Sequence, residues 1–284
     1  MQHMIDAPSF VLHERANSHF YRGHGLLSLK TFPRGNARYT IGNAKFLVEA
    51  PHYLILNHGQ EYTVEIESDV ESFCLFFEVD MASAVYYSVV RDHASILAEP
   101  FLTDQYQPHF VQRTYPDDAL LSGLLERVRA YHRRWERGML EEQLQLVLAR
   151  MIINQQTDLL AMDNMLRSAK VATRLELYAR LHLARDYIEA MYSEPLQLND
   201  LALVAAMSPG HMLRTFKELF GQTPHQYLIN VRLNHAKRLL LTTDTPVTEI
   251  GVSVGFESLG SFSWLFRQRF GLSPRAYRTN LDDF

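Results

Sequence analysis

A segment of twenty residues occurs twice within the last eighty residues of this 284-residue chain. The first copy runs from Ser208 to Tyr227 and the second from Ser258 to Tyr277, so the period is 50 residues. Ser, two Phe, Gly, Pro and Tyr are identical at matching places, and Lys217 is matched by Arg267. A fixed internal period indicates a duplicated structural unit, so any fold proposed for the chain has to contain that unit twice.

Each copy carries the signals of a helix that ends at a glycine. Apolar residues recur at helical spacing in both copies, at Met212, Phe216 and Leu219 in the first and at Phe262, Phe266 and Phe270 in the second. Gly221 and Gly271 come directly after these segments, where a helix C-terminus needs a residue with positive φ. We therefore expect a helix before each glycine.

A shorter apolar segment and a tight turn precede each copy. These segments are Leu198–Ala206 and Val247–Gly255. A short helix, a turn and a second helix make a helix-turn-helix unit, which we predict at about 196–221 and again at 245–271. Tyr227–Leu241 has the pattern of one amphipathic helix linking the two units. A helical solenoid is the alternative, but such repeats usually need three or more units to bury a continuous core.

The repeat region also carries a series of short motifs in a fixed order. They are Leu201-Ala202, Met207-Ser208-Pro209, Arg214-x-Phe216-Lys217, Arg232-Leu233, Ala236, Leu239-Leu240, Ile250-Gly251, Gly255-Phe256, Phe266-Arg267, Phe270-Gly271, Ser273-Pro274 and Tyr277-Arg278. In this order they resemble the DNA-binding domain of AraC/XylS family transcriptional regulators of bacteria. The resemblance covers about 170–284. It implies an all-α DNA-binding domain at 166–284, in which the second helix of each unit is a recognition helix.

The first recognition helix is expected to present a polar stripe. If Met212 and Phe216 face the core, then Gly210, Arg214 and Lys217 lie together on another side of the helix. Arg can pair bidentately with guanine in the major groove, whereas Lys217 is placed to neutralise phosphates. A surface charge without a DNA role is the alternative for Arg214. The predicted DNA-contacting residues of this unit are Gly210, His211, Arg214 and Lys217.

The second unit departs from the pattern of the family. Trp264 stands where the family usually has Arg, and where the first unit has Arg214. An indole has one N–H donor and cannot make the bidentate contact with guanine. It can pack against a thymine methyl group or a sugar, or it can fold back onto its own domain. The predicted DNA-contacting residues of this unit are Gly260, Ser261, Trp264 and Arg267.

The charge distribution agrees with this placement. Residues 198–280 hold nine Lys and Arg against five Asp and Glu, a net charge of +4, whereas the whole chain is at −4. A basic unit on an acidic chain attracts phosphates without making the whole protein adhere to nucleic acid. A charge of +4 does not by itself establish DNA binding.

The N-terminal part, residues 1–116, has a different pattern. Short segments rich in aromatic and branched residues alternate with turn residues, and Glu61–Ile66 has the period-2 alternation of a half-buried strand. The pattern predicts a sandwich or a small barrel, and the family resemblance implies a cupin-like β-barrel that senses a small molecule. The expected strands are Leu26–Phe32, Lys45–Ala50, Tyr53–Leu56, Glu61–Ile66 and Ser72–Val79.

A metalloenzyme is the alternative for the same region. Cupin metal sites use closely spaced His residues and a carboxylate, and the nearest approach is His52, His58 and Glu61, which lack the His-x-His pair. We therefore expect no metal, no cofactor and no catalytic residues. Cys74 lies in an apolar run and is expected to be a buried small hydrophobe.

Two amphipathic patterns follow over 117–165, one on each side of Arg137-Gly138. They are interpreted either as ordinary packing against the barrel or, as in similar regulators, as a helical dimerisation segment. A linker is expected at 163–172, before a long helix from Arg174 to Met191.

These observations predict an α+β chain of two domains that acts as a DNA-binding transcriptional regulator with an effector-sensing N-terminal domain. Its expected partners are double-stranded DNA, a small-molecule effector, a second copy of the chain and RNA polymerase. One Cys cannot form an internal disulfide, and no signal peptide or membrane-spanning run is present, so a cytoplasmic protein is expected. The alternatives are an effector-independent silencer and a cupin-like metalloenzyme with a helical appendage.

Overall fold

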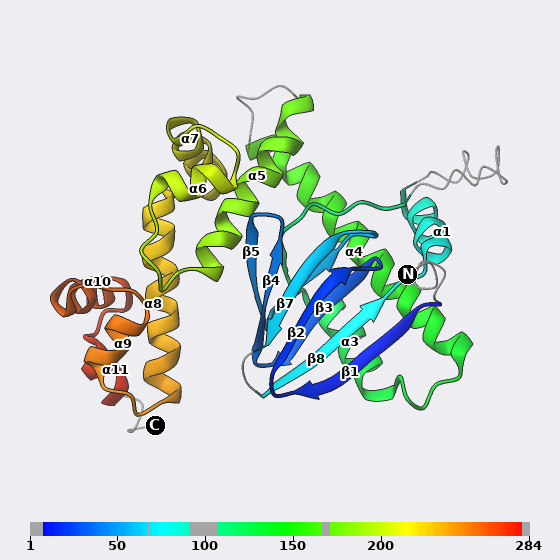
Figure 1. The fold of residues 1–284 in the computed structure, drawn as a ribbon, viewed down its shortest axis with the longest axis horizontal. Coiled ribbons are helices and arrows are strands. Elements are labelled where there is room, and N and C mark those ends of the chain that lie inside the picture. The colour runs from blue at the N-terminus through cyan, green and yellow to red at the C-terminus, as the bar shows by residue number, and fades with distance from the viewer. Residues whose placement is uncertain (1–7, 67–68, 91–106, 166–170, 280–284) are drawn as a thin grey trace. The chain divides into compact units, whose positions relative to one another are not determined.

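The computed structural model describes residues 8–66, 69–90, 107–165 and 171–279. The chain divides into two compact units at His182/Leu183, and helix α5 (Val171–Ala190) runs across the division (Figure 1). The N-terminal unit is rich in β-strands and the C-terminal unit is helical, so the expected two-domain α+β architecture is confirmed.

The N-terminal unit contains two antiparallel sheets rather than one closed barrel. The five-stranded sheet has the order β1-β8-β3-β6-β9 and the four-stranded sheet the order β2-β7-β4-β5. They pack face to face, since Phe32 of β3 contacts Tyr39 of β4 at 6.3 Å between ring centroids. The strands are β1 (Phe10–Ala16), β2 (His19–His24), β3 (Ser28–Arg34), β4 (Asn36–Ile41), β5 (Ala44–Glu49), β6 (His52–Leu56), β7 (Glu61–Ile66), β8 (Val70–Phe76) and β9 (Thr114–Pro116).

The structure corrects the strand expectations at particular places. The strand expected over Ser72–Val79 ends at Phe76, and Val79 begins helix α1 (Val79–Val90). Strands β1, β2, β4 and β9 were not predicted. The β4–β5 hairpin had a readable signal, because Gly42-Asn43 forms its two-residue turn and Gly42 has φ of 58°.

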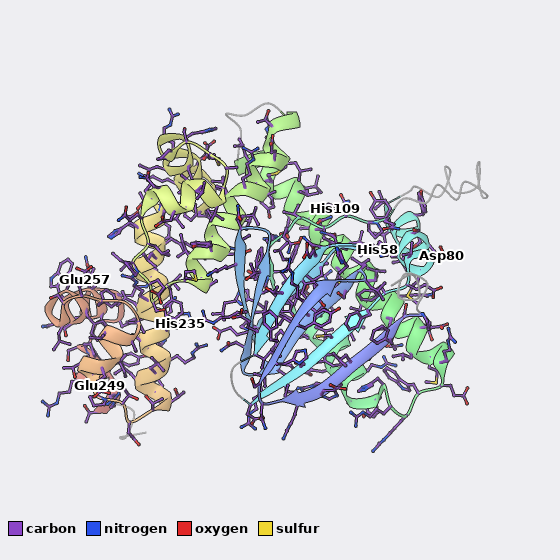
Figure 2. All side chains as sticks on the ribbon, viewed as in Figure 1. His58, Asp80, His109, His235, Glu249 and Glu257 are labelled. Atoms are coloured by element: carbon purple, nitrogen blue, oxygen red, sulfur yellow. The ribbon has the colours of Figure 1, made fainter. Side chains whose placement is uncertain are left out.

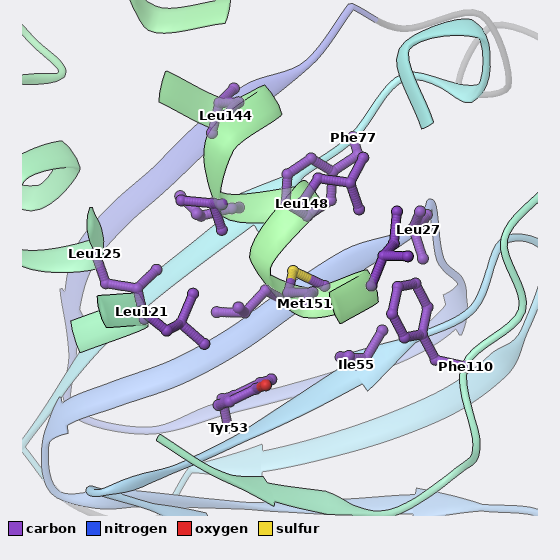
Figure 3. Close-up of a cluster of buried hydrophobic side chains, with 14 of the residues drawn as sticks. Leu27, Tyr53, Ile55, Phe77, Phe110, Leu121, Leu125, Leu144, Leu148 and Met151 are labelled. Atoms are coloured by element: carbon purple, nitrogen blue, oxygen red, sulfur yellow. The ribbon is translucent and has the colours of Figure 1, made fainter. Parts of the chain in front are cut away.

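Helices α1, α3 (Ala119–Tyr131) and α4 (Arg137–Met165) cover the outer face of the five-stranded sheet. Figure 3 shows Leu144, Leu148 and Met151 of α4 above Tyr53 and Ile55 of β6. Both α3 and α4 bury one face here, so ordinary packing accounts for the inner side of the two amphipathic patterns.

Among the residues that the structure describes, neither a metal site nor a membrane-spanning helix is found. His52, His58 and Glu61 do not form a metal site there, since no group of three His, Cys, Asp or Glu side chains is placed to hold an ion. Within the same residues, no helix has the length and apolarity needed to cross a membrane. Cys74 is buried, as predicted.

The C-terminal unit is built around helix α8, which packs against the helix before it and against the helices that follow it (Figure 1). Leu233, Ala236 and Leu240 of α8 pack with Ile250, Phe262 and Phe266 in one of its cores. The expected linker helix is therefore α8. The helices are α6 (Leu198–Val204), α7 (Pro209–Phe220), α8 (Pro224–Thr242), α9 (Val247–Ser253), α10 (Leu259–Phe270) and α11 (Pro274–Thr279). The linker expected at 163–172 is occupied at its ends by α4 and α5, and residues 166–170 lie outside the described residues.

Candidate nucleic-acid interface

Helix α7 is held by a buried face and by defined ends. Met212 and Phe216 are fully buried, and Pro209 occupies the first turn, where its missing N–H leaves no helical hydrogen bond unmade. At the other end Gly221 takes φ of 70° and donates its N–H to the carbonyl of Lys217 at 2.9 Å. Thr223 and Gln226 then form a capping box that starts α8. The orientation of α7 is thereby fixed from both ends.

The sequence repeat is also a repeat of side-chain contacts. In the first unit the rings of Phe216, Phe220 and Tyr227 form a triangle with centroid distances of 4.5, 5.8 and 6.1 Å. In the second unit Phe266, Phe270 and Tyr277 form the same triangle, with distances of 4.6, 5.5 and 5.9 Å. Because these rings join each second helix to the helix that follows it, α7 and α10 are seated in the same way.

The turns inside the two units are equivalent as well. In the first, Met207 donates its N–H to the carbonyl of Ala202 at 2.9 Å, and Ala206 has φ of 49°. In the second, Phe256 donates to Gly251 at 3.0 Å, and Gly255 has φ of 93°. Both patterns are the Schellman motif that ends a helix at a left-handed residue. The helix-turn-helix predicted twice from the sequence is therefore present twice.

All eight residues expected to contact DNA are exposed. On α7, Arg214 and Lys217 lie on the face opposite Met212 and Phe216. On α10 the indole of Trp264 is 64% exposed, so it does not fold back onto its own domain. The exposed set is Gly210, His211, Arg214, Lys217, Gly260, Ser261, Trp264 and Arg267.

The same faces hold two residues that were not predicted. Glu218 follows Arg214 by four positions, and Gln268 follows Trp264 by four, so each lies on the exposed stripe. Gln can pair bidentately with adenine and Glu can accept from cytosine. The spacing alone could have identified both, had the stripe been followed one turn further along the helix.

Not every basic side chain of the unit faces outward. Arg232 donates to the carbonyls of Tyr192 at 2.7 Å and Glu194 at 2.8 Å, and burial lowers the pKa of its guanidinium. Arg278 donates to the carbonyl of Thr245 at 2.7 Å. These two arginines hold the unit together, and fewer basic residues remain for phosphates than the net charge suggests. Two of the acids, Glu249 and Glu257, are exposed on the second unit (Figure 2).

The first helix-turn-helix unit is also held by polar contacts with α5. Tyr227 donates its hydroxyl to Glu189 at 2.6 Å, and burial together with the Glu189 charge raises the pKa of this phenol. The adjacent Arg185–Asp186 pair lies at 2.5 Å, with Asp186 fully buried. Since Tyr227 also packs on Phe216 and Phe220, α5 helps to position α7.

Residues 201–280 match the family described as the helix-turn-helix domain. The chain is 32% identical over 132 residues to the probable transcriptional regulator LumQ of Photobacterium leiognathi, covering 46% of this chain and 52% of LumQ. It is 30% identical over 183 residues to the HTH-type transcriptional activator RhaS of Escherichia coli, covering 64% of each chain. A solved transcriptional regulator from Chromobacterium violaceum, described as AraC-type, is 32% identical over 39% of this chain and 95% of that one, with a TM-score of 0.33. The chain spans 28–64% of the length of the first curated relatives it matches.

Proposed function

Since this chain carries a helix-turn-helix domain of the AraC type and is related to AraC-family regulators, we propose that it is a sequence-specific DNA-binding transcriptional regulator. The observation that carries the proposal is the exposed polar face on α7 and its counterpart on α10, within residues 198–280, which carry a net charge of +4. Such a regulator acts where the chromosome is, which in a bacterium is the cytoplasm, and it needs no catalytic residue.

The two recognition helices would enter successive major-groove segments of double-stranded DNA. Arg214 is assigned to a guanine, while Lys217 and Arg267 are assigned to phosphates. Trp264 has a large exposed apolar surface and suits a thymine methyl group. Gly210, His211, Gly260 and Ser261 lie at the start of the two helices, where close approach to the DNA is expected. The first unit would therefore supply most of the base preference.

A homodimer is proposed through the outer face of α4. Met139, Leu146, Ile153 and Leu160 recur every seven residues and are 51%, 47%, 42% and 70% exposed. The opposite face of the same helix is buried against the sheet. In a seam between two helices, each of the two apolar positions of a heptad recurs every seven residues, and this stripe supplies one of them. Two copies pairing along α4 would place two DNA-binding units on one operator.

The N-terminal unit, with its two antiparallel sheets, is proposed to be a cupin-like domain that senses a small-molecule effector. Binding would change how the sheets, the helices α3 and α4 and the DNA-binding unit pack, and thereby the affinity for DNA. Linkage requires the reciprocal effect, so DNA would change the affinity for the effector by the same factor. RNA polymerase is proposed as the partner that reads the outcome at the promoter.

The test of the DNA-binding role is selection of sites from a random double-stranded library, followed by anisotropy titration of the selected site at several salt concentrations. We expect affinity to fall steeply as salt rises, because basic side chains displace counterions from the phosphates. Lys217→Ala should reduce the salt slope by about 1, whereas Lys45→Ala, on an exposed position of β5, should leave it unchanged. A protein that enriches no sequence and shows no salt dependence would overturn the proposal.

A further inference from the structure

The N-terminal unit contains a cavity of about 250 Å³ on the outer side of the five-stranded sheet. Strands β3, β6 and β8 form its floor and helix α3 forms its wall. The cavity is therefore separate from the space between the two sheets. Small-molecule pockets usually measure about 300–1,000 Å³, so this one suits a compact ligand.

The cavity is apolar at its base and polar at its rim. Tyr53, Phe73 and Leu125 at the base are members of the hydrophobic core, and Figure 3 shows Tyr53 and Leu125 in that core. Asp117, Glu126 and Arg129 stand at the rim. A ligand with an apolar body and one polar end would match both parts.

Asp117 has an acceptor available for that polar end. Its Oδ2 accepts a hydrogen bond from Ser122 Oγ at 2.5 Å, while its Oδ1 is buried and has no hydrogen-bond partner among the described residues. Burial raises the pKa of this carboxyl above its ordinary value. A buried carboxylate oxygen without a donor is costly, so a ligand that supplies an N–H would be favoured there.

The charges around the rim select the sign of the ligand. Arg129 is already in an ion pair with Glu71 at 3.5 Å. Glu126 is exposed on the same wall and adds a second negative charge next to Asp117. An anion would meet two carboxylates, whereas a cation would meet two opposite charges.

We propose that this cavity binds a small primary ammonium compound with an apolar body, whose N–H donates to Asp117 and whose body lies on Tyr53 and Phe73. The binding itself stands on this geometry alone. That the chain uses the amine as its effector rests on the proposed function. The position supports that use, because α3 forms the wall of the cavity and packs directly on α4, the helix proposed to pair two copies.

Calorimetric titration of the full chain with benzylamine and 2-phenylethylamine tests the site, each beside its alcohol and carboxylate counterpart. We expect the amines to bind roughly 10- to 100-fold more tightly than the alcohols, the difference made by one charge-assisted hydrogen bond, and the carboxylates not to bind. Asp117→Asn should reduce amine affinity by a similar factor. Because Asp117 lies at the start of α3 and its loss could disturb folding, Glu126→Lys at an exposed position is the second variant, and Glu136→Lys outside the cavity is its control.

Amines that bind no more tightly than the alcohols, or binding that neither Asp117→Asn nor Glu126→Lys weakens, would overturn the site. The same protein is then titrated with its selected DNA, with and without 2-phenylethylamine. Amine binding that leaves DNA affinity unchanged contradicts the effector role and spares the site. Failure to bind any DNA contradicts the proposed function and likewise leaves the amine result standing.

Discussion

The two equivalent turns of the helix-turn-helix units should respond to substitution with opposite signs. Ala206 holds a left-handed conformation that costs a residue with a side chain about 1–2 kcal/mol. Ala206→Gly removes that strain, but it adds about 0.4–1 kcal/mol of entropy to the unfolded chain. We therefore expect a net stabilisation of about 0.5 kcal/mol.

Gly255→Ala should be strongly destabilising. A Cβ at this position would lie 2.7 Å from the carbonyl oxygen of Ser193 and 2.9 Å from Cζ of Arg232. Neither group can move away easily, since the first is backbone and the Arg232 guanidinium is held by two carbonyls. Strain at φ of 93° and forced repacking, the latter costing about 1–3 kcal/mol, together predict a loss of about 2–4 kcal/mol.

Gly271→Ala separates the two contributions. Gly271 also has positive φ, of 81°, but a Cβ there would meet nothing within 4 Å. Only the backbone strain remains, and we expect a loss of about 1 kcal/mol. Native-state hydrogen exchange of the amides of α7, α8 and α10 measures each change within the C-terminal unit. If Gly255→Ala costs no more than Gly271→Ala, the steric argument is wrong, and if Ala206→Gly destabilises α7, the strain argument is wrong.

Further predictions concern the proposed DNA interface, the proposed dimer seam along α4 and the buried Lys30. Arg214→Ala should weaken binding to the selected site by about 1–3 kcal/mol and relax preference at one base step; equal losses on all sequences would make it a phosphate contact. Trp264→Arg should sharpen the base preference of the second helix-turn-helix unit toward guanine in a repeated selection, and an unchanged profile would show that Trp264 does not contact the bases. Leu146→Asp should shift sedimentation at micromolar concentration toward the monomer, whereas Gln145→Asp, off the stripe, should not; a dimeric Leu146→Asp protein would place the seam elsewhere. Burial lowers the pKa of Lys30 from 10.5 to about 8, so the unfolded chain binds more protons above pH 8. The free energy of unfolding should therefore rise from pH 7.5 to 9.5 by about 2 kcal/mol relative to that of Lys30→Met. The same pH dependence of unfolding free energy in the two proteins would contradict this.

The exposed face proposed to contact DNA was readable from the sequence because helical periodicity is local. Once Met212 and Phe216 are assigned to the core, a 3.6-residue period fixes where Arg214 points, and the structure exposes it. The repeat supplied the same assignment for Trp264. Only the structure decided between an outward and an inward indole, because folding back depends on neighbours that the helix itself does not specify.

The N-terminal unit shows the opposite balance. Alternation in Glu61–Ile66 identified a strand, since a side-chain period of two is a property of the strand alone. Which strand pairs with which is not local: β1 pairs with β8 across more than fifty residues, and β9 joins β6 from beyond α1. The cavity beside Asp117 likewise exists only because α3 packs across that sheet.

The sequence by itself thus determined the duplicated helical unit, its caps and the residues on its exposed face, all of which follow from contacts within about twenty residues. Tertiary structure decided the pairing of the strands into two sheets, the exposure of Trp264 and the burial of an Asp117 oxygen that has no hydrogen-bond partner in the described part of the chain. Each of these depends on segments that are distant in sequence. Where a side chain could be either buried or exposed, contacts with such distant segments decide the outcome, not local preference.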